Sequence, residues 1–194
     1  FTQEEEMQPR GNELFVRRQY YRLVGRPTLL EGHVYDRVPL GAGDEVQSGD
    51  RIECVVSIEA KTNLEYLMLE DLKPAGLEAG GVQSGTPLWA AELTEAEARY
   101  RFGGEELRAG VGARDSGSGS ATGTTGRTRR VHQEWRDRQV GLFLAALPEG
   151  VWEVRYELRA ETPGSFHALP LVGEAMYVPE IRANGANRTV RVVD

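Results

Sequence analysis

The chain has 194 residues, of which 40% are apolar and 27% are charged. This composition is typical of a folded protein with a hydrophobic core rather than of a disordered chain. The net charge of −7 argues against nucleic acid or an anionic membrane as the main partner. No apolar run approaches the roughly 18 residues that a membrane-spanning helix needs. Because the chain begins at Phe1 and carries no signal-peptide pattern, we expect it to be a piece of a longer polypeptide.

The first part of the chain combines a polar segment with one strand. Residues 1–12 are polar and carry an acidic run, and we expect them to form a mobile leading segment. Residues 14–24 are rich in strand-forming side chains, but three arginines blur their alternation: Arg17, Arg18 and Arg22. This segment is predicted as a strand with a mostly solvated face.

A hairpin follows. Arg51 to Ala60 and Leu64 to Leu69 are predicted strands, and the three polar residues between them suit an antiparallel connection. Cys54 alternates in phase with the apolar residues of its strand, so we expect it to fill the core as a small hydrophobe. Since it is the one cysteine of the sequence, an internal disulfide and a cysteine-based zinc cluster are excluded.

The clearest strand runs from Val151 to Ala160, where apolar and charged side chains alternate without a break. Turn-forming Pro and Gly residues flank it on both sides. The capping-box spacing at Thr94 predicts a short helix. Further strands are predicted at Val131–Trp135, Val140–Leu144, Ser165–Leu171, Glu174–Val178 and Thr189–Val193.

Gly110 to Arg130 is a low-complexity stretch of Gly, Ser and Thr. Such a segment buries too little to offset its ordering entropy, so we expect a flexible surface loop. It ends in Arg127, Arg129 and Arg130, which are either solvated or able to dock on an acidic surface. Because strand patterns lie on both sides, the loop interrupts the domain without dividing it.

These elements indicate an all-β fold. Seven to nine short strands separated by turn signals are typical of an antiparallel β-sandwich. We expect residues 1–194 to form a single domain of this class, and no internal repeat is visible in the sequence.

The sequence predicts no active site. A Gly-x-Ser-x-Gly elbow, a Walker A loop, a dinucleotide-binding glycine pattern and an EF-hand loop are all missing from it. If the chain were a hydrolase, Glu134, Asp137 and His167 would have to converge in a cleft. The alternative interpretation of His167 is a purely structural role. Asp71 precedes a Lys-Pro-Ala-Gly corner and is expected to accept hydrogen bonds from turn amides. We expect no catalytic residue, metal or cofactor.

Three segments carry a family resemblance. The first is L-F-V-R-R-Q-Y-Y at 14–21 with G-D-R-I at 49–52, and the second is Y-L-M-L-E-D-L-K-P-A-G at 66–76. The third combines R-D-R at 136–138, R-A-E-T-P-G-S-F-H-A-L-P at 159–170 and A-M-Y-V-P-E-I-R at 175–182. In this order they resemble the C-terminal macroglobulin-like domain, of the MG10 type, of bacterial α2-macroglobulins. The insertion at 110–130 has no counterpart in the family pattern.

The resemblance implies a fibronectin-like β-sandwich with no catalysis of its own. In these periplasmic or otherwise extracytoplasmic protease traps, a Cys–Gln thioester in another domain reacts with a protease that has cut a bait segment. The terminal domain packs on the thioester domain and other macroglobulin domains of the same polypeptide, and meets target proteases only indirectly. A Met–Tyr pair covers the thioester against water. The matching residues are Met176 and Tyr177, with Pro179 stiffening the loop. No nucleic acid and no membrane contact by this domain are implied.

Two alternatives remain. Met176 and Tyr177 could be ordinary core residues of a strand, with Met as a gap filler. The chain could also be a stand-alone adhesive or ligand-binding β-sandwich of the cell envelope, with Arg127 to Arg130 as its contact. The thioester motif itself is missing from this chain, since Cys54 is followed by two valines instead of Leu-Glu-Gln.

Overall fold

The computed structural model describes residues 7–28, 32–41, 43–80, 87–102 and 123–194. Within them the chain is almost entirely β structure, with one short helix, α1 (Glu95–Phe102), directly after Thr94 as predicted. No helix of this described part is long and apolar enough to cross a membrane. The strands are β1 (Arg10–Gly11), β2 (Leu14–Thr28), β3 (Gly32–Pro39), β4 (Glu45–Gln47), β5 (Arg51–Ala60), β6 (Leu64–Asp71), β7 (Leu77–Ala79), β8 (Leu88–Leu93), β9 (Thr124–Trp135), β10 (Val140–Leu147), β11 (Gly150–Ala160), β12 (Gly164–Ala168), β13 (Val172–Ala175), β14 (Val178–Asn184) and β15 (Arg188–Val193).

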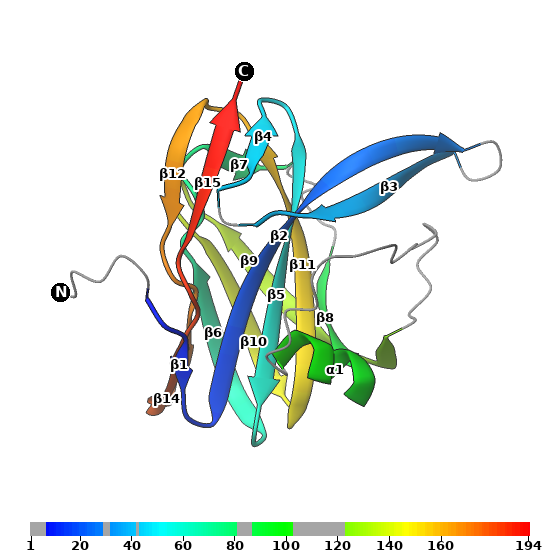
Figure 1. Ribbon diagram of the computed structural model, residues 1–194. Coiled ribbons are helices and arrows are strands. Elements are labelled where there is room, and N and C mark those ends of the chain that lie inside the picture. Colours follow the sequence, from blue (N-terminus) through cyan, green and yellow to red (C-terminus); the bar gives the residue numbers. More distant parts are fainter. Residues whose placement is uncertain (1–6, 29–31, 42, 81–86, 103–122) are drawn as a thin grey trace.

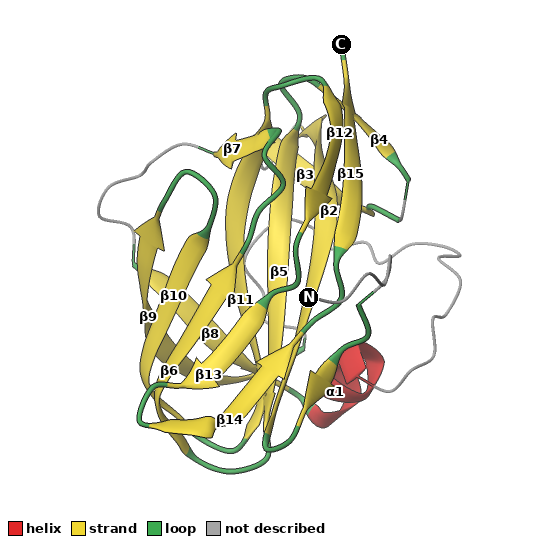
Figure 2. Ribbon diagram, turned by 90° about the vertical axis from the view of Figure 1, so that its left-hand side faces the viewer, coloured by secondary structure: helices red, strands yellow, loops and turns green. Residues whose placement is uncertain are grey.

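Twelve of these strands form one antiparallel sheet that curls around the core (Figures 1 and 2). Its order is β1-β14-β13-β6-β10-β9-β8-β11-β5-β2-β3, and β7 pairs with β11 beside this path. The other sheet has the order β12-β15-β4, in which β15 and β4 are parallel. The all-β, mostly antiparallel class is confirmed. The predicted strand number is too low, since no predicted strand corresponds to β1, β3, β4, β7 or β8. The shortest of these, β1, β4 and β7, are defined by distant partners and carry little apolar pattern of their own.

One long strand explains why the sheet curls instead of splitting into two separate layers. The first part of β9 pairs with β8, from Thr124 to Val131, and its last part pairs with β10, from His132 to Trp135. The two limbs of the curl are therefore continuous through β9. Instead of a sandwich of two separate sheets, as expected from the sequence, the twelve-stranded sheet folds over the core, and the small sheet β12-β15-β4 contributes further side chains to it.

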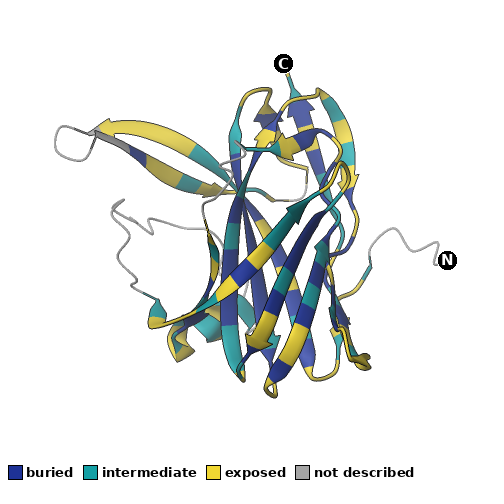
Figure 3. Ribbon diagram, turned by 180° about the vertical axis from the view of Figure 1, so that it is seen from behind, coloured by how far each residue is buried: buried dark blue, intermediate teal, exposed yellow. Residues whose placement is uncertain are grey.

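The core lies between these limbs. Figure 3 shows buried and exposed residues alternating along the strands, as expected when one face of a sheet is covered. Trp152 on β11 and Leu69 on β6 are fully buried, and Trp135 places its ring 5.7 Å from that of Tyr156 in a T-shaped contact. Cys54 is fully buried as predicted.

β2 and β3 extend beyond the curled sheet. β2 pairs with β5 only as far as Leu23, while its pairing with β3 continues to Thr28. The distal half of this hairpin therefore has one partner strand, and it projects from the body of the molecule (Figure 1).

Two predicted irregular segments contain regular structure. Of the expected loop 110–130, residues 110–122 lie outside the described part, but Thr124 to Arg130 form the first half of β9. Of the expected leading segment 1–12, residues 1–6 lie outside the described part, and Arg10 and Gly11 pair with β14. In both cases a neighbouring strand supplies backbone partners that a polar sequence does not reveal.

Candidate functional site

Met176 and Tyr177 form the turn between β13 and β14. The sequence predicted one strand through this region, whereas the structure pairs Ala175 with Val178 and leaves the two residues between them as a tight connection. Two adjacent side chains are therefore presented at the tip of a hairpin. The resemblance placed this pair on a loop, and in the structure the pair forms a hairpin turn.

Pro179 follows the turn in an irregular part of β14. Glu174 pairs with Arg182 and Ala175 with Val178, so three residues of β14, at positions 179–181, bulge between successive pairs. Arg182 Nε donates a hydrogen bond to the Pro179 carbonyl oxygen across this bulge, at 3.0 Å. A proline is tolerated here because β1 pairs only with the far end of β14, which leaves the N–H position of residue 179 on an open edge.

The turn side chains point away from the core. Tyr177 is 74% exposed and Met176 is 48% exposed, and the adjoining Val178 is 46% exposed. Neither residue fills the interior, so the alternative that both are core residues does not describe this structure. Contiguous exposed apolar side chains make this turn a candidate contact surface.

Tyr66 on β6 lies beside this turn. The Met176 N–H donates a hydrogen bond to the Tyr66 carbonyl oxygen at 2.9 Å. The Tyr66 and Tyr177 ring centroids are 4.9 Å apart with an interplanar angle of 89°, which is an edge-to-face contact. Tyr66 has φ +52°, which is unusual for a bulky side chain. Sequence reasoning missed this residue.

A buried polar network holds the chain that leads into β13. Arg18 pairs with Asp71 inside the core, Tyr156 donates a hydrogen bond to the same carboxylate, and Cys54 Sγ lies 3.4 Å from it. Arg18 Nη2 also donates to the Leu169 carbonyl oxygen at 2.8 Å, three residues before β13. Asp71 thus accepts from side chains of β2, β5 and β11, instead of the turn amides expected from the sequence.

The network changes the acidity of its members. Burial alone would lower the pKa of Arg18, but the neighbouring acidic groups, Asp71 foremost, together hold that pKa above its ordinary value. Burial, reinforced by the same carboxylate, raises the pKa of Tyr156 and of Cys54 well above their usual ranges. The hydroxyl and the thiol are therefore protonated donors at neutral pH.

A match to a protein-family model decides the family of this chain. A family model described as the bacterial alpha-2-macroglobulin MG10 domain matches residues 14–180 of this chain. The chain belongs to this family. The match includes the Met176–Tyr177 turn, Tyr66 and the whole buried network. Alpha-2-macroglobulins are protease inhibitors rather than enzymes.

Curated relatives agree with this assignment. The alpha-2-macroglobulin of Xylella fastidiosa strain 9a5c is 28% identical over 184 residues, which are 94% of this chain and 9% of the relative. That of strain Temecula1 / ATCC 700964 is 27% identical over 174 residues, or 90% of this chain and 8% of the relative. The chain therefore spans less than a tenth of the length of the curated relatives it matches.

Solved structures share the fold. The crystal structure of native Escherichia coli alpha-2-macroglobulin from domain MG7 to the C-terminus matches with a TM-score of 0.58 and 21% identity, over 96% of this chain and 24% of that one. Salmonella alpha-2-macroglobulin reacted with methylamine matches with a TM-score of 0.60 and 20% identity, over 97% of this chain and 10% of that one.

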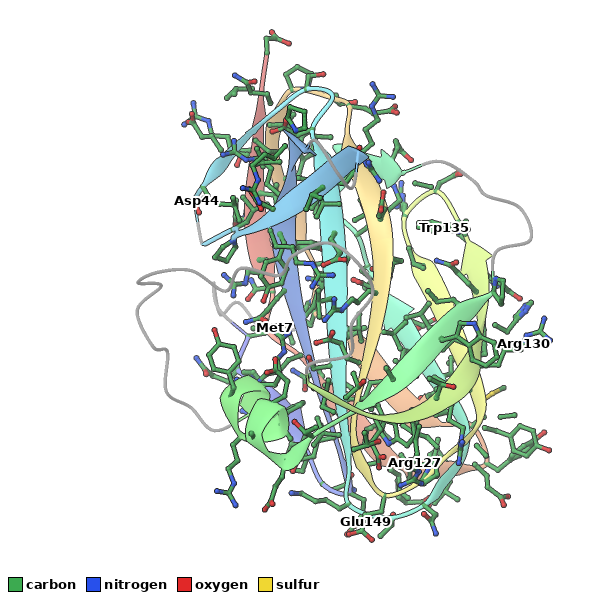
Figure 4. All side chains as sticks on the ribbon, turned by 90° about the vertical axis from the view of Figure 1, so that its right-hand side faces the viewer. Met7, Asp44, Arg127, Arg130, Trp135 and Glu149 are labelled. Atoms are coloured by element: carbon green, nitrogen blue, oxygen red, sulfur yellow. The ribbon has the colours of Figure 1, made fainter. Side chains whose placement is uncertain are left out.

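The arginines considered as an adhesive contact lie on β9 of the MG10 domain. Arg127 forms an ion pair with Glu92 at 2.8 Å, and the Arg127 and Arg129 guanidinium carbons each lie 5.6 Å from the Trp152 ring centroid. Arg127 and Arg130 lie at different places along the sheet surface (Figure 4). Two of the three arginines are thus engaged with their own sheet, and they do not form a single basic tip.

The residues considered for hydrolysis are separated in the MG10 domain. Glu134 lies on β9 and pairs with Arg136 at 3.1 Å, whereas His167 lies on β12 of the small sheet and contacts the Thr189 hydroxyl at 3.1 Å. Asp137 lies in the turn between β9 and β10. Across the described ranges, no group of three or more His, Cys, Asp or Glu side chains could hold a metal ion.

Proposed function

We propose that this MG10 domain, acting as one domain over residues 1–194, packs on the thioester domain of a bacterial alpha-2-macroglobulin and shields its thioester with Met176 and Tyr177. The domain contributes no catalysis of its own, and it affects proteases only through the trap to which it belongs. The observation that carries the proposal is the Tyr177 ring, 74% exposed on a braced two-residue turn.

The chemistry of such a lid is simple. A thioester survives in water only if water and amines are kept away from its carbonyl carbon. A tyrosine ring covers a wide apolar area, while its hydroxyl keeps a hydrogen bond at the rim. Covering the exposed three-quarters of Tyr177 would contribute about 3–5 kcal/mol at about 25 cal/mol per Å². Before the cost of ordering the packed side chains is subtracted, this gain is enough to keep the ring packed on a small surface and to exclude water from it.

The test uses the full-length parent protein and methylamine. The amine attacks the thioester carbonyl carbon, the C–S bond breaks, and each thioester yields one amide and one thiol. We expect Tyr177→Ala to release this thiol at least about tenfold faster, which corresponds to a loss of about 1.4 kcal/mol of protection.

Tyr100→Ala is the matched control, because Tyr100 is also an exposed tyrosine, at 57%, but lies on α1. It should release thiol at the wild-type rate. A wild-type rate for Tyr177→Ala, or a parent protein that releases no thiol with methylamine, would overturn the proposal.

The proposal also places the domain outside the cytoplasm. Alpha-2-macroglobulins that trap proteases must meet them in the periplasm or cell envelope, so the parent protein belongs there. Fractionation of the producing bacterium checks this, with recovery of the parent in the cytoplasmic fraction as the contrary outcome.

A further inference from the structure

The side-chain pattern of β6 reverses in the middle of the strand. Leu64, Leu67 and Leu69 are buried. The two successive residues between the first pair, Glu65 and Tyr66, are both exposed. A regular strand would place Leu64 and Tyr66 on the same face. The reversal occurs at Tyr66, whose φ of +52° departs from the extended backbone on either side.

The neighbouring strand accommodates this irregularity. β10 pairs Leu144 with Leu67 and Ala146 with Glu65, so the ladder omits the position of Tyr66. Ala145 and Ala146 are exposed in succession on β10, matching the reversal on β6. The kink therefore crosses both strands, and its result is that the Tyr66 ring lies on the outer surface.

On that surface Tyr66 contacts both residues of the turn. Its carbonyl oxygen accepts the Met176 N–H at 2.9 Å, and its ring packs edge-to-face on Tyr177. Backbone strain of this kind persists only where surrounding structure enforces it, and it clusters at functional sites. Here the strained residue contacts the Met176 backbone and the Tyr177 ring, which belong to the two residues that the proposed lid uses.

We propose that Tyr66 is a positioning residue that fixes the orientation of the Tyr177 ring before it meets the thioester domain, an inference that rests on the function proposed above. A ring that is 74% exposed and lacks a neighbour would occupy several rotamers, and its coverage of a small target would be intermittent. The edge-to-face contact restricts the ring in advance, so less ordering is needed when the two domains pack.

The experiment compares two substitutions of Tyr66 in the full-length parent protein. Tyr66→Gly removes the ring and adopts positive φ readily, so the kink and the carbonyl that accepts from Met176 are retained. Tyr66→Phe keeps the ring. Thiol release by methylamine should be several-fold faster in Tyr66→Gly and unchanged in Tyr66→Phe, with both variants melting at the wild-type temperature.

A double variant shows whether Tyr66 acts through Tyr177. If it does, Tyr66→Gly with Tyr177→Ala releases thiol no faster than Tyr177→Ala alone. If the double variant instead shows the product of the two single effects on the rate of thiol release, the positioning role is overturned. A wild-type rate in Tyr66→Gly beside a fast Tyr177→Ala would overturn it too and would leave the shielding function intact. A wild-type rate in Tyr177→Ala would overturn the shielding function itself, and the role of Tyr66 with it.

Discussion

Arg18 and Asp71 form an ion pair in the centre of the core, where their side chains are 1% and 0% exposed. Asp71 also accepts from Tyr156, and Arg18 also donates to the Leu169 carbonyl before β13. The pair therefore joins the two limbs of the curled sheet and anchors the segment that leads to the Met176–Tyr177 turn.

Asp71→Asn should destabilise the domain strongly. Removing one partner leaves the Arg18 charge buried without its counter-ion, which costs about 3–5 kcal/mol. Urea unfolding of the 194-residue chain measures this. Glu59→Gln is the control, because the Lys61–Glu59 pair lies near the surface and should contribute at most about 1 kcal/mol. Equal losses in the two variants would contradict a structural role for the buried pair.

Stability should fall at alkaline pH. The native pKa values of Tyr156 and Cys54 are raised, so the native state keeps protons that the unfolded chain loses near pH ~10 and ~8.5. As the pH rises through each of these values, the unfolded state binds fewer protons than the native state, and the group concerned lowers the free energy of unfolding by up to about 1.4 kcal/mol per pH unit. Below about pH 7 both groups are almost fully protonated in both states, and this contribution to the pH dependence is close to zero.

The variant Tyr156→Phe isolates one of these contributions. It should lose about 1–3 kcal/mol at neutral pH, because Asp71 loses a hydrogen bond. Above about pH 10 its stability should decline less steeply than that of the wild type. Parallel pH profiles for the two proteins would show that Tyr156 titrates normally in the folded domain.

Cys54 should be inert to thiol reagents in the native state. Its side chain is fully buried and its pKa is raised, and both properties suppress the reactive thiolate. We expect one reactive thiol in concentrated guanidinium chloride and essentially none under native conditions. Rapid native labelling at Cys54 would contradict the buried network, and it would also complicate the thiol-release assay.

Gly76 should tolerate no side chain. A Cβ at this position would lie 2.2 Å from Cε2 of Phe166, inside the closest approach of two carbons. Gly76→Ala must therefore displace the Phe166 ring from its place against the core, at a cost of about 1–3 kcal/mol. Gly123→Ala is a suitable control, since its nearest neighbour would be at an ordinary 3.5 Å. The midpoint of urea unfolding distinguishes the two.

The sequence predicted the strands that carry their own pattern. β5 has the predicted bounds, Arg51 to Ala60, and its apolar phase is unbroken. The first half of β9 was missed, because its Thr and Arg side chains carry no alternation and its partner β8 lies far away in sequence. Arg18 was assigned to a solvated face, since an arginine on a strand does not reveal a buried carboxylate that would accept it.

The candidate site was predicted only in part. The resemblance indicated Met176, Tyr177 and Pro179, but the strand pattern alone placed the first two within a strand. The sequence L-E-Y-L gives one local signal at Tyr66, because Leu64 and Leu67 are three residues apart and a regular strand cannot place both on one face. This signal alone does not show which of the two leucines faces the core. Its positive φ depends on β10 and β13, which pair on either side of β6, and so could not be inferred from β6 itself.

The central claim is that Tyr177 lies over the thioester of the neighbouring domain, and photo-cross-linking tests it most directly. A benzoylphenylalanine in place of Tyr177 in the native parent protein should cross-link on irradiation to the peptide that carries the thioester cysteine or glutamine. The same group in place of Tyr100 on α1 should not reach that peptide. Cross-links from position 177 that fall only within this domain, or in a region remote from the thioester, would contradict the account.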